Sequence, residues 1–166
     1  MRLILILACV IFTIYNVVVL NLFGIPKSLS KTYYLFKEKY NIGWVFPVTL
    51  IVIIGLLMPL WLTISQGSIY QFFAFLAPAS ILFVATAPAF NKTFLEGTVH
   101  NVFAVIGVTC AILWIILVTQ YWWIFLIITG CITIIAILFK TLKTSCIYWF
   151  ELSAFISTFI TMFLYM

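Results

Sequence analysis

Few residues in this chain could take part in acid–base or metal chemistry. The only histidine is His100, the only acidic residues are Glu38, Glu96 and Glu151, and aspartate is absent. His100 follows Glu96 by four residues, so the two share one face of a helix, with Asn101 beside them. Glu151 lies inside an apolar run, where ionisable groups are costly and usually face the interior of a helix bundle. His100, Glu151, Glu96 and Asn101 are therefore the candidate polar site.

Two interpretations of this site are open. In one, Glu151 and His100 line a pocket that faces the cytoplasm and binds a ligand or transfers protons. In the other, they form a buried hydrogen-bonded pair that orients two helices. Glu96 also has a structural explanation, because Thr93-Phe94-Leu95-Glu96 has the form of a capping box at the start of a helix. No residue is assigned a catalytic role.

Metal ligands are too few for a metal site. One histidine with two carboxylates is a weak set, and a haem held by two histidines is excluded. The four cysteines, Cys9, Cys110, Cys131 and Cys146, form no C-x-x-C pair, which favours isolated thiols over a metal site or a disulfide framework. The sequence predicts no metal and no cofactor.

The composition predicts that lipid, and not water, surrounds most of the chain. Of the 166 residues, 67% are hydrophobic and 7% are charged, whereas a soluble domain has about 25% charged residues. The net charge of +5 comes from basic residues spread among apolar runs, without a patch that could follow a phosphate backbone. This pattern excludes a nucleic-acid partner and makes the lipid bilayer the first expected partner.

Six apolar segments are long enough to cross a bilayer as helices, which takes about 20 residues each. Their continuous hydrophobicity favours helices over a membrane barrel. The predicted fold class is an all-α, polytopic transmembrane bundle of about six helices, forming one integral membrane domain over residues 1–166. Because only Gln120 separates the fourth and fifth segments, they should form an antiparallel hairpin. The segments are 3–23, 43–65, 69–90, 93–119, 121–139 and 146–166.

The connection over residues 24–42 is the only one long enough for structure of its own. It mixes lysines with tyrosines and aliphatic residues, a pattern typical of a short helix lying in the membrane interface. An ordinary basic loop is the alternative. The interfacial basic residues are Lys27, Lys31, Lys37 and Lys39.

The basic residues also predict the orientation. Seven of the eight fall in connections on one side, including Lys92, Lys140 and Lys143, and only Arg2 falls on the other. The positive-inside rule makes the lysine-rich side cytoplasmic. The sequence thus predicts a multi-pass protein of a bacterial cytoplasmic membrane with both termini on the non-cytoplasmic side.

The fourth segment has a face suited to close helix packing. Ala104, Gly107 and Ala111 continue the face of His100, and Gly107-x-x-x-Ala111 is a small-xxx-small pattern. Such a face accommodates a neighbouring helix of the same chain, of a second copy or of another membrane protein. A homo-oligomer or a partner membrane protein is therefore among the expected partners.

Two stretches resemble a known group of proteins. Residues 24–34 (GIPKSLSKTYY) and 96–104 (EGTVHNVFA) are similar to small uncharacterised six-span membrane proteins of gut bacteria and their phages. The resemblance implies a helical bundle and no known activity, so it assigns no functional residue.

These observations favour a non-enzymatic membrane module that binds a lipid, a small ligand or a partner helix near the cytoplasmic leaflet. The alternative is a membrane-embedded enzyme, or a transporter coupled to protons or ions, that uses Glu151 and His100. No nucleophile or metal set at a defined spacing supports the enzyme, so the sequence favours the binding module.

Overall fold

The computed structural model describes residues 1–91 and 93–166, so Lys92 lies outside the described residues. In this part of the chain all regular secondary structure is helical, with seven α-helices and no strands. A π-helical turn continues α5 without a break. The helices are α1 Arg2–Phe23, α2 Thr32–Tyr40, α3 Val45–Ile64, α4 Gln71–Thr86, α5 Phe94–Trp114 with the π turn Ile115–Thr119, α6 Trp122–Leu138 and α7 Leu142–Tyr165.

A helix occupies each of the six apolar segments, but the helices differ in length. Four of them are long and apolar enough to cross a membrane: Arg2–Phe23, Val45–Ile64, Phe94–Thr119 and Leu142–Tyr165. Helices α4 and α6 have 16 and 17 residues, roughly 24–26 Å at the rise of an α-helix. The structure therefore supports an all-helical fold with four long apolar helices, and the six-span arrangement remains a prediction.

Helix α4 is shorter than the segment 69–90 predicted for it. It ends at Thr86, and Ala87 has left the helical region with φ −114° and ψ 54°. The cause is Pro88, whose ring disfavours the α conformation of the preceding residue. Residues 87–90 become part of the connection to α5 and are free to fold over that helix.

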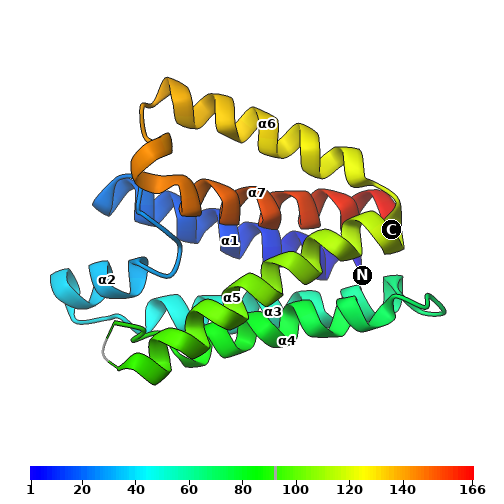
Figure 1. The fold of residues 1–166 in the computed structure, drawn as a ribbon, viewed down its shortest axis with the longest axis horizontal. Coiled ribbons are helices and arrows are strands. Elements are labelled where there is room, and N and C mark those ends of the chain that lie inside the picture. The colour runs from blue at the N-terminus through cyan, green and yellow to red at the C-terminus, as the bar shows by residue number, and fades with distance from the viewer. Residues whose placement is uncertain (92) are drawn as a thin grey trace.

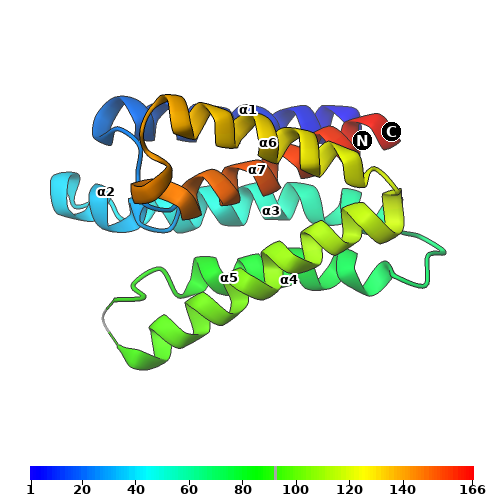
Figure 2. The same cartoon turned by 45° about the horizontal axis from the view of Figure 1, so that its top comes forward.

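The long helices run side by side, and their connections gather at two ends (Figures 1 and 2). Both chain termini lie at one end, together with the α3–α4 and α5–α6 connections. Helix α2 and the α6–α7 connection lie at the opposite end, which we call the basic end because it carries Lys27, Lys31, Lys37, Lys39, Lys140 and Lys143. Helix α2 confirms that the 24–42 connection contains a short helix.

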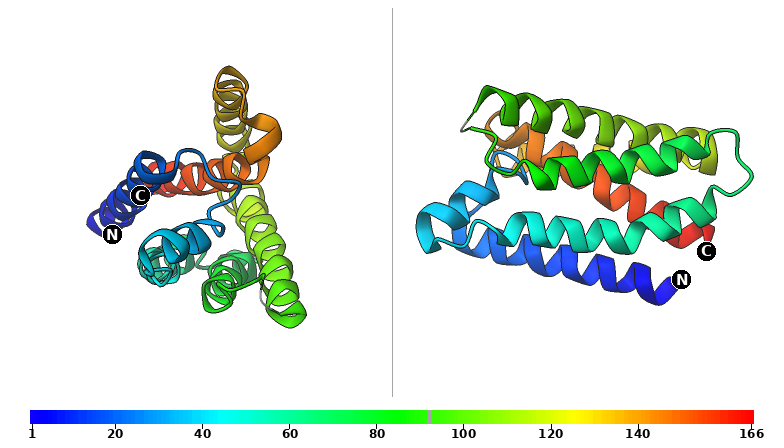
Figure 3. Two further views of the ribbon diagram at one scale, coloured as in Figure 1. Left: turned by 90° about the vertical axis from the view of Figure 1, so that its left-hand side faces the viewer. Right: turned by 90° about the horizontal axis from the view of Figure 1, so that it is seen from below.

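Helix α7 is central, whereas α6 is peripheral. Helix α7 contacts α1, α3, α5 and α6, while α4 packs between α3 and α5. Helix α6 packs chiefly along α7 and buries only Ile124, Ile132 and Ala136 (Figure 3).

The turn between α5 and α6 reverses the chain, as predicted, but the two helices then diverge (Figure 3). Gln120 adopts a left-handed conformation with φ 62° directly after the π turn, and Thr119 accepts a hydrogen bond from the amide of Tyr121. This geometry directs α6 away from α5 and onto α7. The hairpin is therefore open, and each helix packs on a different neighbour.

Gly107 lies at a close contact between α5 and α4. A Cβ atom at this position would lie 3.0 Å from Ile81 Cγ1, 3.3 Å from Ser80 Cβ and 3.4 Å from the carbonyl oxygen of Ala77. The absence of a side chain thus allows the two helices to pack tightly, and buried Ala111 continues this face.

We expect Gly107→Leu to lower the free energy of unfolding by about 1–3 kcal/mol, because the larger side chain overpacks the α4–α5 contact. Gly130→Leu on α6 is the matched control, since a Cβ there meets no atom within 4 Å. Thermal unfolding of both variants in the same detergent measures the difference. Equal melting temperatures for the two variants would contradict close packing at Gly107.

Candidate functional site

Glu151 is bound to a backbone amide far away in the sequence. Its Oε2 accepts a hydrogen bond of 2.7 Å from the amide of Leu29, which lies in the connection between α1 and α2. The backbone amide thus satisfies one oxygen of the carboxyl group. A buried carboxyl oxygen without such a partner would be costly.

A kink in α7 provides a second link to the same connection. Ser145 departs from helical geometry with φ −132° and ψ 28°, so the helix effectively restarts after it. The first amides of a restarted helix have no partner within it. One of them, the amide of Tyr148, donates a hydrogen bond of 3.1 Å to the carbonyl oxygen of Lys27. The α1–α2 connection is thus held to α7 at both Lys27 and Leu29.

Side-chain hydroxyls link the same region to α1. Tyr15 of α1 is hydrogen-bonded to Thr32 at the start of α2, and the Thr32 hydroxyl also donates to the carbonyl oxygen of Leu29. Leu29 therefore uses both of its backbone polar groups.

A hydrogen bond between side chains joins α1 directly to α7. Tyr148 donates a hydrogen bond of 3.1 Å to Asn16 Oδ1, and Asn16 Nδ2 donates to the carbonyl oxygen of Phe12 at 2.8 Å. Asn16 is buried, so this bridge satisfies a polar group that would otherwise be costly in the core.

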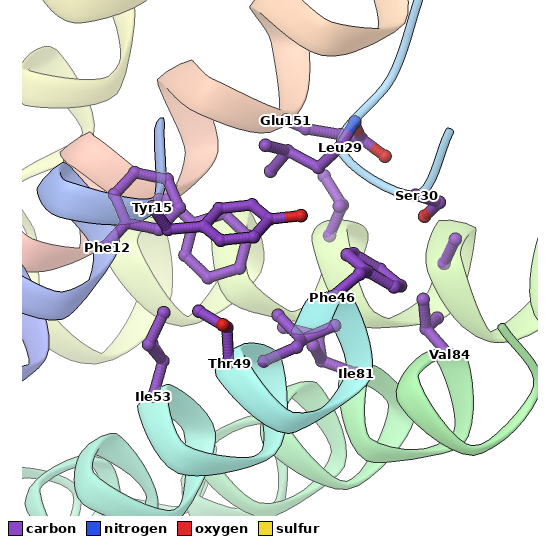
Figure 4. A pocket seen from close by; sticks show the side chains of 14 residues that line it. Phe12, Tyr15, Leu29, Ser30, Phe46, Thr49, Ile53, Ile81, Val84 and Glu151 are labelled. Carbon is purple, nitrogen blue, oxygen red and sulfur yellow. The ribbon is translucent and has the colours of Figure 1, made fainter. Parts of the chain in front are cut away.

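A cavity of about 60 Å³ lies beside Glu151 (Figure 4). One water molecule needs about 10–15 Å³ measured in this way, so the cavity can hold a small chemical group or a few waters. Its wall is mostly aliphatic and aromatic, and its polar members are Glu151, Tyr15, Ser30 and Thr49. The remaining lining residues are Phe12, Leu29, Phe46, Leu50, Ile53, Ile81, Val84, Ala104, Val108 and Phe155.

His100 has partners of its own and does not line the cavity. Its Nδ1 lies 3.0 Å from the carbonyl oxygen of Ala87, a geometry that assigns the proton to Nδ1. Its ring stacks on Phe90 with the centroids 4.4 Å apart. Gly97 permits this arrangement, since a Cβ there would lie 2.8 Å from the carbonyl oxygen of Phe90. His100 therefore fastens the segment 87–90 over the start of α5.

The other two candidate residues are placed elsewhere. The amide of Glu96 donates to Thr93 Oγ1 at 3.1 Å, as the predicted cap requires, but its carboxyl oxygen Oε2 is buried without a partner among the described residues. Asn101 is exposed on the outside of α5. Within the described residues no hydrogen bond joins any two of His100, Glu151, Glu96 and Asn101, so the structure does not bring them together as one network.

The sequence interpretation missed Tyr15, Asn16, Thr32 and Tyr148. These residues carry no charge. Tyr15 and Asn16 also lie in the apolar segment 3–23, for which the sequence predicts only a membrane-spanning helix. An amide inside an apolar helix, as at Asn16, was the available signal, because such a group must find a partner within the protein.

Three of the lysines at the basic end lie over aromatic rings. The Lys31 ammonium is 4.7 Å from the centroid of Tyr34, and the Lys37 ammonium is 5.7 Å from that of Tyr33. Lys39 lies near Phe23 and Tyr40, whereas Lys27 contributes its backbone carbonyl to α7.

Comparisons of the chain with protein-family models, curated proteins and solved structures gave no match. The resemblance described from residues 24–34 and 96–104 therefore stays a prediction. Among the described residues, no group of three histidine, cysteine or acidic side chains lies close enough together to hold a metal ion. The function is argued below from the cavity beside Glu151.

We expect Glu151→Leu and His100→Ala each to destabilise the protein by about 1–3 kcal/mol, because each removes the partner of a backbone group. Since the two side chains have separate partners, the double variant should cost their sum to within about 0.5 kcal/mol. Equilibrium unfolding of the four proteins in one detergent measures this. A double variant that costs clearly less than the sum would indicate a shared site.

Proposed function

We propose that this chain is a multi-pass membrane protein that binds a small amphiphile at its basic end and performs no catalysis. In this proposal all six apolar helices cross the bilayer. The shorter α4 and α6 are accommodated by local thinning of the membrane, which costs a fraction of a kcal/mol per Å of mismatch. The polar end of the ligand binds in the cavity of about 60 Å³ beside Glu151, and its apolar remainder lies outside this cavity.

The distribution of charge supports the orientation. The lysines of the α1–α2 and α6–α7 connections lie at one end of the bundle, and both termini lie at the other (Figure 1). By the positive-inside rule the basic end faces the cytoplasm, and both termini are non-cytoplasmic. The resemblance to proteins of gut bacteria and their phages suggests the bacterial cytoplasmic membrane as the location.

The observation that carries the proposal is the environment of the Glu151 carboxyl group. One oxygen accepts the amide hydrogen of Leu29, and no group among the described residues donates to the other. The same side chain lines a cavity whose wall is otherwise mostly apolar. A carboxyl oxygen there can accept a hydrogen bond from a hydroxyl or an ammonium group. The ligand we infer therefore has such a group at one end and an apolar remainder.

The alternative of an enzyme or an ion-coupled transporter that uses Glu151 with His100 has less support. His100 is occupied by the Ala87 carbonyl and by the ring of Phe90, and it lies outside the cavity lining. A general base and its partner must both lie within hydrogen-bond distance of the same reacting group. The separate partners of the two residues favour a binding site over an acid–base pair.

A photoactivatable monoacylglycerol in phosphatidylcholine nanodiscs tests the proposal, because it carries hydroxyl groups on an apolar chain. We expect irradiation to label cavity residues of the wild-type protein. Ala104→Phe should reduce this labelling about tenfold by filling the cavity. Val105→Phe is the matched control, since Val105 neighbours Ala104 but is exposed on the outside of α5.

Labelling of Ala104→Phe equal to that of Val105→Phe would contradict the proposal. Labelling confined to the outer faces of the helices would also contradict it. Melting temperatures of both variants, measured in the same nanodiscs, separate loss of the cavity from loss of the fold.

A further inference from the structure

A second concave surface lies outside the bundle and is distinct from the cavity. Helices α1, α2 and α3 border an open groove of about 490 Å³. Its wall is formed chiefly by apolar side chains, among them Ile14, Val18 and Leu22 of α1, Phe36 of α2 and Val45 of α3. Tyr15 and Thr49 line both the groove and the cavity, so they stand between the two. A ligand in the groove therefore does not need to enter the cavity.

Lys39 places a positive charge at the end of this groove. Its Nζ donates a hydrogen bond of 3.3 Å to the carbonyl oxygen of Leu22, and it lies 5.2 Å from the ring centroid of Tyr40. Leu22 and Tyr40 both line the groove, so the ammonium group lies at its edge. The ring of Phe23 is also close, at 5.3 Å.

The end of α1 explains why Lys39 is held there. The last carbonyl groups of a helix have no partner within it, and the negative end of the helix dipole attracts a cation. An ammonium group has three hydrogen-bond donors, and the groups that Lys39 contacts among the described residues, the Leu22 carbonyl and two aromatic rings, carry no charge. The Lys39 ammonium is therefore positioned by the protein while its charge and two donors remain available.

We propose that the groove between α1, α2 and α3 binds one anionic phospholipid. One acyl chain lies along the apolar wall, and the phosphate group binds the Lys39 ammonium at the basic end. We choose an anionic lipid because its charge is complementary to that of α2. This helix and its N-cap contain three lysines, Lys31, Lys37 and Lys39, and one acidic residue, Glu38. A zwitterionic lipid could fill the groove but would gain less from this positive charge. This inference goes beyond the amphiphile site, since it requires no ligand in the cavity.

Native mass spectrometry tests the proposal on the full chain released from detergent micelles. Dioleoylphosphatidylglycerol and dioleoylphosphatidylcholine are added at equal concentrations. We expect the wild-type protein to retain one molecule of the anionic lipid about fivefold more than one of the zwitterionic lipid. Lys39→Gln should abolish this preference, and Lys39→Arg should keep it. Lys143→Gln removes the same charge at the same end but away from the groove, and should leave the preference unchanged.

A second pair of variants tests the acyl chain and does not alter the end of α1. Val18→Trp fills the groove and should reduce retention of the first molecule of either lipid several-fold. Val17→Trp is its matched control, because Val17 is exposed on the same helix but does not line the groove.

Three results would overturn the proposal. They are equal retention of the two lipids by the wild-type protein, the same preference in Lys39→Gln as in Lys143→Gln, and the same retention in Val18→Trp as in Val17→Trp. Should Lys39→Gln unfold, as judged by its melting temperature, the comparison of the two tryptophan variants decides.

Discussion

The hydrogen bond from the Leu29 amide to the Glu151 carboxyl group joins the α1–α2 connection to α7. The other interactions at the basic end depend on this hydrogen bond. It places the α1–α2 connection against α7, where Lys27 accepts the amide of Tyr148. With the connection held there, Thr32 reaches Tyr15 and α2 begins beside α1. Leu29, Ser30 and Glu151 then form part of the cavity wall, so the cavity and its polar group arise from the same contact.

The same contact solves a problem of backbone hydrogen bonding. A kink such as that at Ser145 leaves helix amides without partners, and in the proposed membrane setting no water is available to replace them. The connection between α1 and α2 supplies the carbonyl of Lys27 for one of these amides. In return, α7 supplies the Glu151 carboxylate for the Leu29 amide. The irregular backbone of each segment thus finds its hydrogen-bond partner in the other segment. This exchange explains why Glu151, a costly acid, lies in an apolar helix.

Much of the fold could be predicted from the sequence, because long apolar runs leave few alternatives to helices. The six segments all contain helices, and the start of the predicted last segment at Cys146 coincides with the kink at Ser145. Helix α4 is shorter than predicted because Pro88 disfavours the helical conformation of Ala87. The divergence of α5 and α6 depends on one left-handed residue, Gln120, which hydrophobicity does not reveal.

The site could be predicted only in part. Glu151 is an acid inside an apolar run and needs a partner, but its partner is a backbone amide, and every residue except proline has one. His100 was expected to face the bundle interior, and it is buried, yet its partners are the Ala87 carbonyl and the ring of Phe90. Sequence spacing gives the face of a helix but not which loop folds against it.

Hydrogen exchange of the Leu29 amide tests this account most directly, because it reports on the hydrogen bond itself. In the wild-type protein the peptide that contains Leu29 should exchange slowly. Glu151→Leu should accelerate exchange in residues 24–31 and leave the α4–α5 region unchanged, whereas Glu151→Gln keeps an acceptor oxygen and should preserve most of the protection. Equal protection of the Leu29 amide in the wild type and in Glu151→Leu would show that the connection is held by other contacts, and it would contradict the account.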